Sequence, residues 1–184
     1  MRTRRIPISF VLITAIIALA AGPAVADPVV WDPAAGGNAH SYELVPGKDG
    51  LTWEAARQAA EGRFWQGMAG QLAALTSPEE NAWVWEALDH PAGCWLGGYQ
   101  LPGAIAPDEG WQWISGDLWV FANWEPGQPD GTEGDGRLRF AASTLTGGWD
   151  DACATCAGTG YIVEYAPMST PSDQQTWGAI KGLF

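Results

Sequence analysis

The segment from Trp124 to Asp151 constrains this chain most, because its acidic side chains lie on polypeptide rich in glycine and proline. It contains, in chain order, Gln128-Pro129-Asp130, Asp135 and Trp149-Asp150-Asp151. Glycine and proline at this density predict an irregular loop and not a helix or a regular strand. Carboxylates that lie a few ångströms apart repel one another unless a cation neutralises them. Loops that supply carboxylate and amide oxygens are typical of calcium sites, so the segment predicts one.

The first 26 residues have the pattern of an export signal. Three arginines precede an apolar run over residues 6–20, and Ala24-Val25-Ala26 then provides a small-residue cleavage site. We therefore expect a signal peptide at 1–26, cleavage before Asp27, and a secreted, extracytoplasmic protein. Because no later run is apolar and long enough to cross a bilayer, no membrane span is expected after cleavage.

The remainder of the chain is strongly acidic. Without the three arginines of the signal it has 6 basic residues against 21 acidic ones, which gives a net charge of −15. A charge of this sign argues against nucleic acid or an anionic membrane as the partner. It is compatible with a secreted protein that holds divalent cations.

Capping signals and periodicity predict two helices among several strands. Thr52 can cap a helix that extends to Arg63. A second helix begins at Ser77-Pro78, where Ser77 is the cap and Glu80 closes a capping box. Strands are expected at residues 41–46, 94–99, 110–114, 137–140 and 160–165. The twelve tryptophans are expected mostly in the core or as loop anchors, since each buries a large apolar area.

This order of elements, together with several short motifs, resembles the C-type lectin-like domain over roughly residues 39–165. The motifs are, in chain order, Gly50-Leu51-Thr52-Trp53-Glu54-Ala55-Ala56-Arg57, Gly70-Gln71-Leu72-Ala73-Ala74-Leu75-Thr76-Ser77 with Glu80-Asn81, Trp95-Leu96-Gly97-Gly98, Trp111-Gln112-Trp113-Ile114-Ser115-Gly116 and Asn123-Trp124. The resemblance implies an α+β fold, with two helices flanking small antiparallel sheets and a long calcium-binding loop. The chain would then divide into a signal peptide at 1–26, an N-terminal extension at 27–38, the C-type lectin-like domain at 39–166 and a C-terminal tail at 167–184.

The resemblance also implies the ligands of one Ca²⁺ ion. These are Gln128, Asp130, Asp135, Asp150 and Asp151. In sugar-binding members of the family, two neighbouring hydroxyls of the sugar complete the calcium shell, and the implied sugar contacts here are Gln128, Asp130, Asp135 and Asp150. A Gln-Pro-Asp triplet implies a galactose-type preference, and its proline is usually cis.

Asp150 departs from the family pattern, which has asparagine at this position. An ionised carboxylate only accepts hydrogen bonds, whereas an amide also donates one. A sugar hydroxyl between Asp135 and Asp150 would face two acceptors with a single proton, at a cost of roughly 1–3 kcal/mol. The change is therefore predicted to strengthen calcium binding and to weaken sugar binding.

The chain has three cysteines, which are Cys94, Cys153 and Cys156. Export favours their oxidation. Cys153 and Cys156 could close a small loop just after the predicted site, and Cys94 with Cys153 is the competing pair. One thiol remains unpaired in either case.

Together these observations predict a secreted, Ca²⁺-dependent carbohydrate-binding module of the lectin type, with a galactose-type glycan as its partner. The alternative is a calcium-stabilised C-type lectin-like adhesion or structural protein that binds a cell-surface protein. The sequence contains no recognisable acid–base pair with a nucleophile, so no enzymatic activity is expected.

Overall fold

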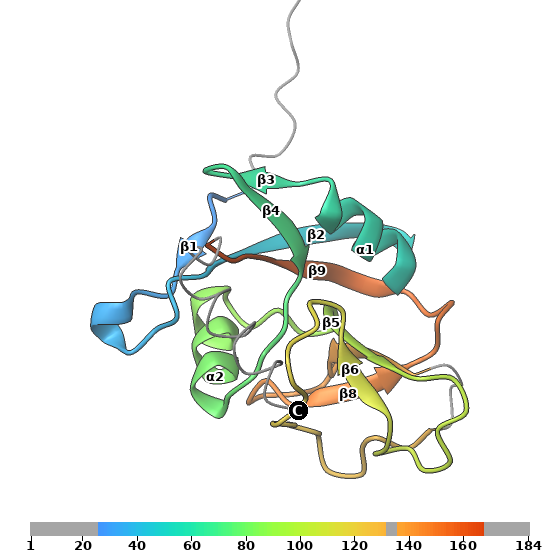
Figure 1. Ribbon diagram of the computed structural model, residues 1–184. Coiled ribbons are helices and arrows are strands. Elements are labelled where there is room, and N and C mark those ends of the chain that lie inside the picture. The colour runs from blue at the N-terminus through green and yellow to red at the C-terminus, as the bar shows by residue number, and fades with distance from the viewer. Residues whose placement is uncertain (1–25, 132–135, 168–184) are drawn as a thin grey trace, which may run out of the picture.

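The structure, a computed structural model, describes residues 26–131 and 136–167. The helices in this part of the chain are a short 3-10 helix, η1 (Pro33–Ala35), and the α-helices α1 (Trp53–Glu61) and α2 (Pro78–Ala87). The strands are β1 (Val29–Val30), β2 (Ser41–Leu51), β3 (Phe64–Trp65), β4 (Met68–Leu72), β5 (Cys94–Gln100), β6 (Trp111–Trp113), β7 (Arg137–Phe140), β8 (Trp149–Ala152) and β9 (Gly158–Tyr165) (Figure 1). The predicted α+β class is confirmed.

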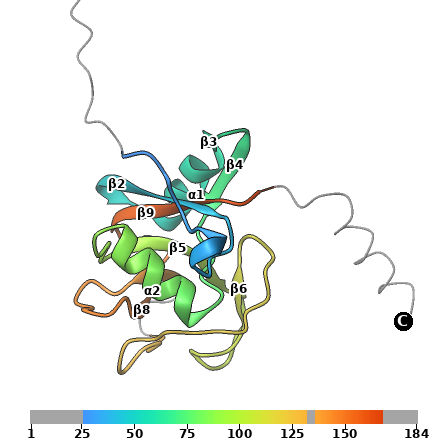
Figure 2. The same cartoon turned by 90° about the vertical axis from the view of Figure 1, so that its left-hand side faces the viewer.

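The strands form one mixed sheet, in the order β1-β2-β9-β5-β7-β8, with β4 also paired to β9 and β6 to β5. The pairings are antiparallel except that of β5 with β9, which run parallel. Figures 1 and 2 show α1 and α2 on opposite sides of the long β2–β9 pair. The helices thus cover the sheet in the arrangement that the sequence predicts.

Helix α1 forms where its capping and apolar residues predict it. The Thr52 hydroxyl accepts a hydrogen bond from the Ala55 N–H at 3.3 Å, which satisfies a donor that has no partner inside the helix. Trp53, Ala56 and Ala60 recur at helical spacing and are buried. The helix therefore packs one apolar face on the sheet and leaves the other in water.

Helix α2 confirms the predicted start but not the predicted capping box. The Ser77 hydroxyl accepts from the Glu80 N–H at 3.1 Å, and Pro78 occupies the first turn. The Glu80 carboxylate instead accepts the N–H of Thr76 at 2.6 Å, one residue before the cap, and points into the domain. A sequence pattern cannot distinguish these two outcomes because the N–H donors of Thr76 and Ser77 are both within reach of the Glu80 carboxylate.

Seven of the described tryptophans are buried, as the composition predicts. They are Trp31, Trp53, Trp85, Trp95, Trp111, Trp113 and Trp149. One apolar cluster surrounds Trp113 and Trp149, and a second, which contains Trp53 and Trp95, lies between α1 and β9. The core thus contains two groups of indole rings, and the first of them lies directly under the predicted site.

Two sequence expectations change, one at the end of the acidic segment and one in the N-terminal extension. Asp150 and Asp151 lie in β8, which pairs with β7, so they are on a regular strand and not in a loop. The predicted N-terminal extension contains β1, which pairs with β2, and Trp31, which stacks on Trp83 with ring centroids 5.9 Å apart.

Apart from Ala26 and Pro167, the predicted signal peptide and tail lie outside the described residues. Within residues 26–131 and 136–167, no helix is long and apolar enough to span a membrane.

Candidate functional site

The start of the acidic segment is held against strand β8. Trp124 forms a parallel β-bridge with Trp149, and the Glu125 N–H donates to the Trp149 carbonyl at 2.9 Å. The two indole rings meet edge to face, with centroids 6.0 Å apart. The pair therefore anchors this loop to the core, as the positions of the two tryptophans predict.

The Asp151 carboxylate holds the Gln-Pro-Asp triplet in place. Its Oδ1 accepts the Asp130 N–H at 3.0 Å, and its Oδ2 accepts the Gly131 N–H at 2.9 Å. The Gln128 side-chain oxygen accepts the same Asp130 N–H at 3.1 Å, and the Gln128–Pro129 peptide bond is cis, as expected. The fold thus brings together Gln128, Asp130 and Asp151 across more than twenty residues of sequence.

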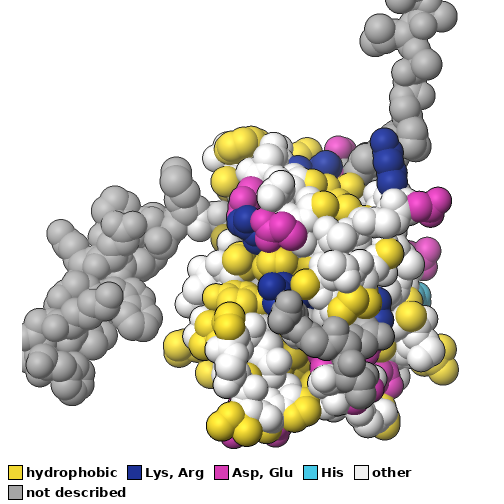
Figure 3. Space-filling view, turned by 90° about the vertical axis from the view of Figure 1, so that its right-hand side faces the viewer, with side chains coloured by type: hydrophobic (Ala, Val, Ile, Leu, Met, Phe, Trp, Pro, Cys, Tyr) yellow, Lys and Arg dark blue, Asp and Glu magenta, His cyan; other side chains and the backbone are white. Residues whose placement is uncertain are grey.

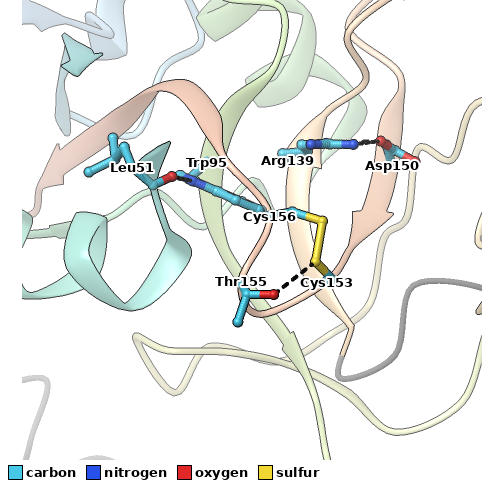
Figure 4. The surroundings of a disulfide bond; sticks show 7 residues. All are labelled: Leu51, Trp95, Arg139, Asp150, Cys153, Thr155 and Cys156. Carbon is cyan, nitrogen blue, oxygen red and sulfur yellow. Dashed lines mark hydrogen bonds and ion pairs between the residues drawn. A yellow bond between two sulfur atoms is a disulfide. The ribbon is translucent and has the colours of Figure 1, made fainter. Parts of the chain in front are cut away.

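Asp150 has a different environment from Asp151 because successive side chains of a strand point to opposite faces. It lies directly across from Arg139 in the β7–β8 ladder, and its Oδ2 accepts from Nε at 2.9 Å and from Nη2 at 2.7 Å (Figure 4). Both side chains are mostly buried, with 16% and 18% of their surface exposed. The guanidinium carbon lies 5.8 Å from the centre of the Trp95 ring, on whose face it packs.

The described residues assemble only part of the predicted ligand set. Asp135 lies outside them, so its place in the site remains a prediction. Within the described part of the chain, the carboxylates of Asp130, Asp150 and Asp151 do not gather within 4.8 Å of one another. The donor chemistry nevertheless fits calcium, because every predicted ligand offers a hard oxygen. Two of these oxygens, Gln128 Oε1 and Asp151 Oδ1, already converge on one N–H group.

The predicted local disulfide is confirmed. Cys153 and Cys156 are bonded in the turn between β8 and β9, close to the Trp95 side chain and the Arg139–Asp150 pair (Figure 4). Cys94 is the free thiol; it is buried beside Thr159, and burial raises its pKa to about 11. The competing Cys94–Cys153 pairing is therefore excluded, and the free thiol is poorly nucleophilic.

A second polar cluster, which the sequence analysis did not anticipate, lies between β2, β9 and α2. It consists of His40, Glu80 and Glu164, whose potential metal-ligating atoms all lie within 4.8 Å of one another. His40 Nδ1 lies 2.5 Å from a Glu164 oxygen, and the other Glu164 oxygen accepts the Ala74 N–H at 3.0 Å. The Tyr42 hydroxyl donates to Glu80 at 2.5 Å. No local pattern signals this cluster because its members are at least 40 residues apart, and the bonded pair His40 and Glu164 is 124 residues apart.

The charge state of this cluster depends on pH. Burial opposes protonation of His40, but its hydrogen bond to Glu164 and the nearby charges of Glu164, Glu80 and Asp117 outweigh burial and raise the His40 pKa above 6.5. Burial also raises the pKa of Glu164, which is almost fully enclosed. The folded state holds a proton on His40 more tightly than the unfolded chain does, and this difference stabilises the folded domain. The stabilisation is complete below about pH 6.5 and is lost as pH rises through the raised His40 pKa.

Sequence comparison places this chain beside a much larger protein. No protein-family model matches it. Halomucin of Haloquadratum walsbyi is 31% identical over 150 residues, a match that covers 72% of this chain. The match spans only about 2% of the length of Halomucin. The function of that far longer protein therefore cannot be transferred to this chain.

Solved structures supply the decisive comparison. C-type lectin CEL-I from Cucumaria echinata superposes with a TM-score of 0.57 and 24% identity, covering 69% of this chain and 90% of its own. The cow C-type carbohydrate-recognition domain of CD23, solved in the presence of a GlcNAc2Man3 oligosaccharide, has a TM-score of 0.56 and 21% identity, covering 71% and 90%.

The described domain has the C-type lectin-like fold. The fold alone does not decide the ligand. A calcium-independent type II antifreeze protein superposes nearly as well, with a TM-score of 0.55 at 24% identity, covering 69% of this chain and 86% of its own. What a C-type lectin-like domain binds must therefore be argued from the residues at its loops.

Proposed function

We propose that this chain is an extracytoplasmic, calcium-dependent carbohydrate-binding module with a preference for galactose-type sugars. The observation that carries the proposal is the junction of the Gln128-Pro129-Asp130 segment, which lies in a loop, with Asp151 of strand β8. Two ligand oxygens already converge there. The similarity to CEL-I and to the CD23 carbohydrate-recognition domain supports a sugar as the ligand class.

In this proposal the ligands are Gln128, Asp130, Asp135, Asp150 and Asp151. Bound calcium supplies coordination positions that two neighbouring sugar hydroxyls complete. The Gln128 amide can donate to one hydroxyl while the Asp130 carboxylate accepts from the other. The order of donor and acceptor along the triplet would then select the geometry of the sugar diol.

Glycan-array binding with and without EDTA tests the function. We expect binding to galactose-terminated glycans that EDTA abolishes and added calcium restores. The double variant Gln128→Glu/Asp130→Asn exchanges donor and acceptor, so it should shift preference toward mannose-type glycans. Asp108→Asn, at an exposed position, is the matched control. Binding that survives EDTA and ignores the exchange would reject the proposed site.

A second candidate function is adhesion to a protein partner. It is favoured by apolar side chains on the loops of the same end of the domain. Ile105, Leu118, Val120 and Leu145 have between 73% and 96% of their surface exposed. Figure 3 also shows hydrophobic side chains along the lower edge of one face. An array on which no glycan binds, together with calcium uptake that stabilises the domain, would favour this second function.

A further inference from the structure

A mostly apolar groove that the proposed function does not use lies between the N-terminal segment, strand β2 and the end of helix α2. Its volume is about 440 Å³, and Val29, Leu44, Val45 and Leu88 are among the residues that line it. The described residues between 124 and 151 do not line it, so it is separate from the predicted calcium site. Because pockets of roughly 300–1,000 Å³ hold small ligands, the groove has room for several side chains.

The groove follows an edge of β2 that no described strand covers. Strand β1 pairs only with Ser41 and Tyr42, and the order of the sheet gives β2 no other described neighbour on this side. Val29 and Val30 of β1 are themselves 40% and 48% exposed. An open strand edge beside apolar side chains is a surface on which another segment can dock. The described part of the chain leaves this surface uncovered.

The sequence supplies a matching segment at residues 176–184. Its apolar side chains are those of Trp177, Ala179, Ile180, Leu183 and Phe184. The preceding residues 169–175 are polar apart from Pro171. Apolar residues are therefore concentrated in one short stretch of the predicted C-terminal tail, and a polar stretch connects it to the domain.

The charges of this segment and of the groove are complementary. Lys181 is the only basic residue of the predicted tail. Asp27 and Asp89 line the groove and are exposed, whereas Glu43, which also lines it, is already paired with an arginine. The attraction between exposed charges is small, so it orients the segment while burial of apolar surface supplies most of the binding free energy.

The segment starts close enough to the groove to reach it. Strand β9 ends at Tyr165, which pairs with Ser41 at the start of β2. From Ser41 to Val45 the strand rises about 13 Å, at roughly 3.3 Å per residue. Residues 168–175 can span up to about 26 Å when extended, so the stretch that follows them can enter the groove. A tethered segment also has an effective concentration on the order of millimolar, which favours docking within its own domain.

We propose that residues 176–184 bind in this groove of their own domain, with their apolar side chains against β2 and α2 and Lys181 at the acidic rim. The bound segment closes the open edge of β2 and holds β1 against α2. The contact uses neither calcium nor a sugar, so it does not depend on the proposed function.

Trypsin cleavage after Lys181 tests the docking, because it is the only trypsin site of the predicted tail. The exported chain, residues 27–184, is digested in EDTA, and release of residues 182–184 is followed by mass spectrometry. Cleavage should be slower than in a peptide of residues 168–184 by about tenfold or more, since the protease cuts only the undocked fraction.

A substitution in the groove separates docking from the properties of the cleaved segment. Val29→Asn should raise the cleavage rate several-fold toward that of the peptide, because it places a polar side chain in the groove and leaves the segment unchanged. Val30→Asn is the matched control, because this neighbour in β1 has a similar exposure but points to the opposite face, so the rate should stay the same. Trp177→Ser should act as Val29→Asn does, relative to a peptide that carries the same substitution.

Two results would overturn the inference directly. They are cleavage of wild type as fast as that of the peptide, and equal cleavage rates for wild type and Val29→Asn. Protection of Lys181 that grows with protein concentration would assign the groove to a segment of a second copy, and would also overturn docking within the domain. Because the digestion is carried out in EDTA and without glycan, each of these results leaves the proposed function intact.

Discussion

Asp151→Asn is the most informative single substitution in the calcium-free protein. It keeps the shape of the side chain but replaces one of two oxygens, each of which accepts a backbone N–H, by an amide nitrogen. The Asp130 N–H retains the Gln128 oxygen at 3.1 Å, so the new amide nitrogen should turn toward Asp130 and keep its oxygen on Gly131. The variant then loses one charge-assisted hydrogen bond and weakens the other.

The expected loss of stability is about 2 kcal/mol, because a hydrogen bond to a charged group contributes roughly 1.5–3 kcal/mol and removing a buried charge offsets part of that. For a domain of this size, each kcal/mol lowers the melting temperature by about 2–4 °C, so the shift should be about 4–8 °C. The assay is thermal unfolding in EDTA, with Asp108→Asn as the exposed control. Amide hydrogen exchange should also show reduced protection at Asp130, whose N–H loses the Asp151 oxygen, and at Gly131, whose hydrogen bond is weakened. A melting temperature within about 1 °C of wild type, with unchanged exchange rates at both amides, would refute the proposed role of Asp151 at this junction.

Two further predictions concern the framework around the site. The melting temperature of wild type should fall as pH rises from 6.5 through the raised pKa of His40, and His40→Gln should flatten this decline. Both proteins are measured between about pH 5 and 9. An unchanged pH profile would mean that the His40–Glu164 contact does not hold the proton. The double variant Cys153→Ser/Cys156→Ser should lose about 2 kcal/mol of stability, because that is the value expected when a disulfide closes so short a loop. Wild type treated with a reductant should melt at the same temperature as the variant. If the reductant lowers the melting temperature of the double variant as much as that of wild type, the effect of the reductant comes from another thiol and not from this disulfide.

Much of the fold is predictable because its signals are local. Thr52 and Ser77 cap the two helices as predicted, since a capping hydroxyl acts on an N–H only three residues away. The missed strands, β1, β3, β4 and β8, are two to five residues long. Segments so short carry too little periodicity to be recognised, and they pair only because the rest of the sheet supplies their partner strands.

In the candidate site too, some features are local in the sequence and others depend on the tertiary structure. Its residue types, from Gln128 to Asp151, are visible in the sequence because glycine, proline and carboxylates are concentrated in one segment. The neighbours of each carboxylate depend on which face of β8 it occupies and on the register with β7. One residue of displacement along a strand therefore separates Asp151, which holds the triplet, from Asp150, which meets Arg139.

The sequence by itself determined where the two helices begin and that an oxygen-rich segment is suited to a hard cation, because both follow from neighbouring residues. The class of the fold followed from the order of motifs that resembles the C-type lectin-like domain, and the structure chose the local disulfide from two possible pairings. Only the tertiary structure decided that Arg139 neutralises Asp150 and that His40 meets Glu164. Those contacts depend on strand register and on pairing between distant segments, which are fixed when the whole sheet and its two tryptophan-rich cores pack together.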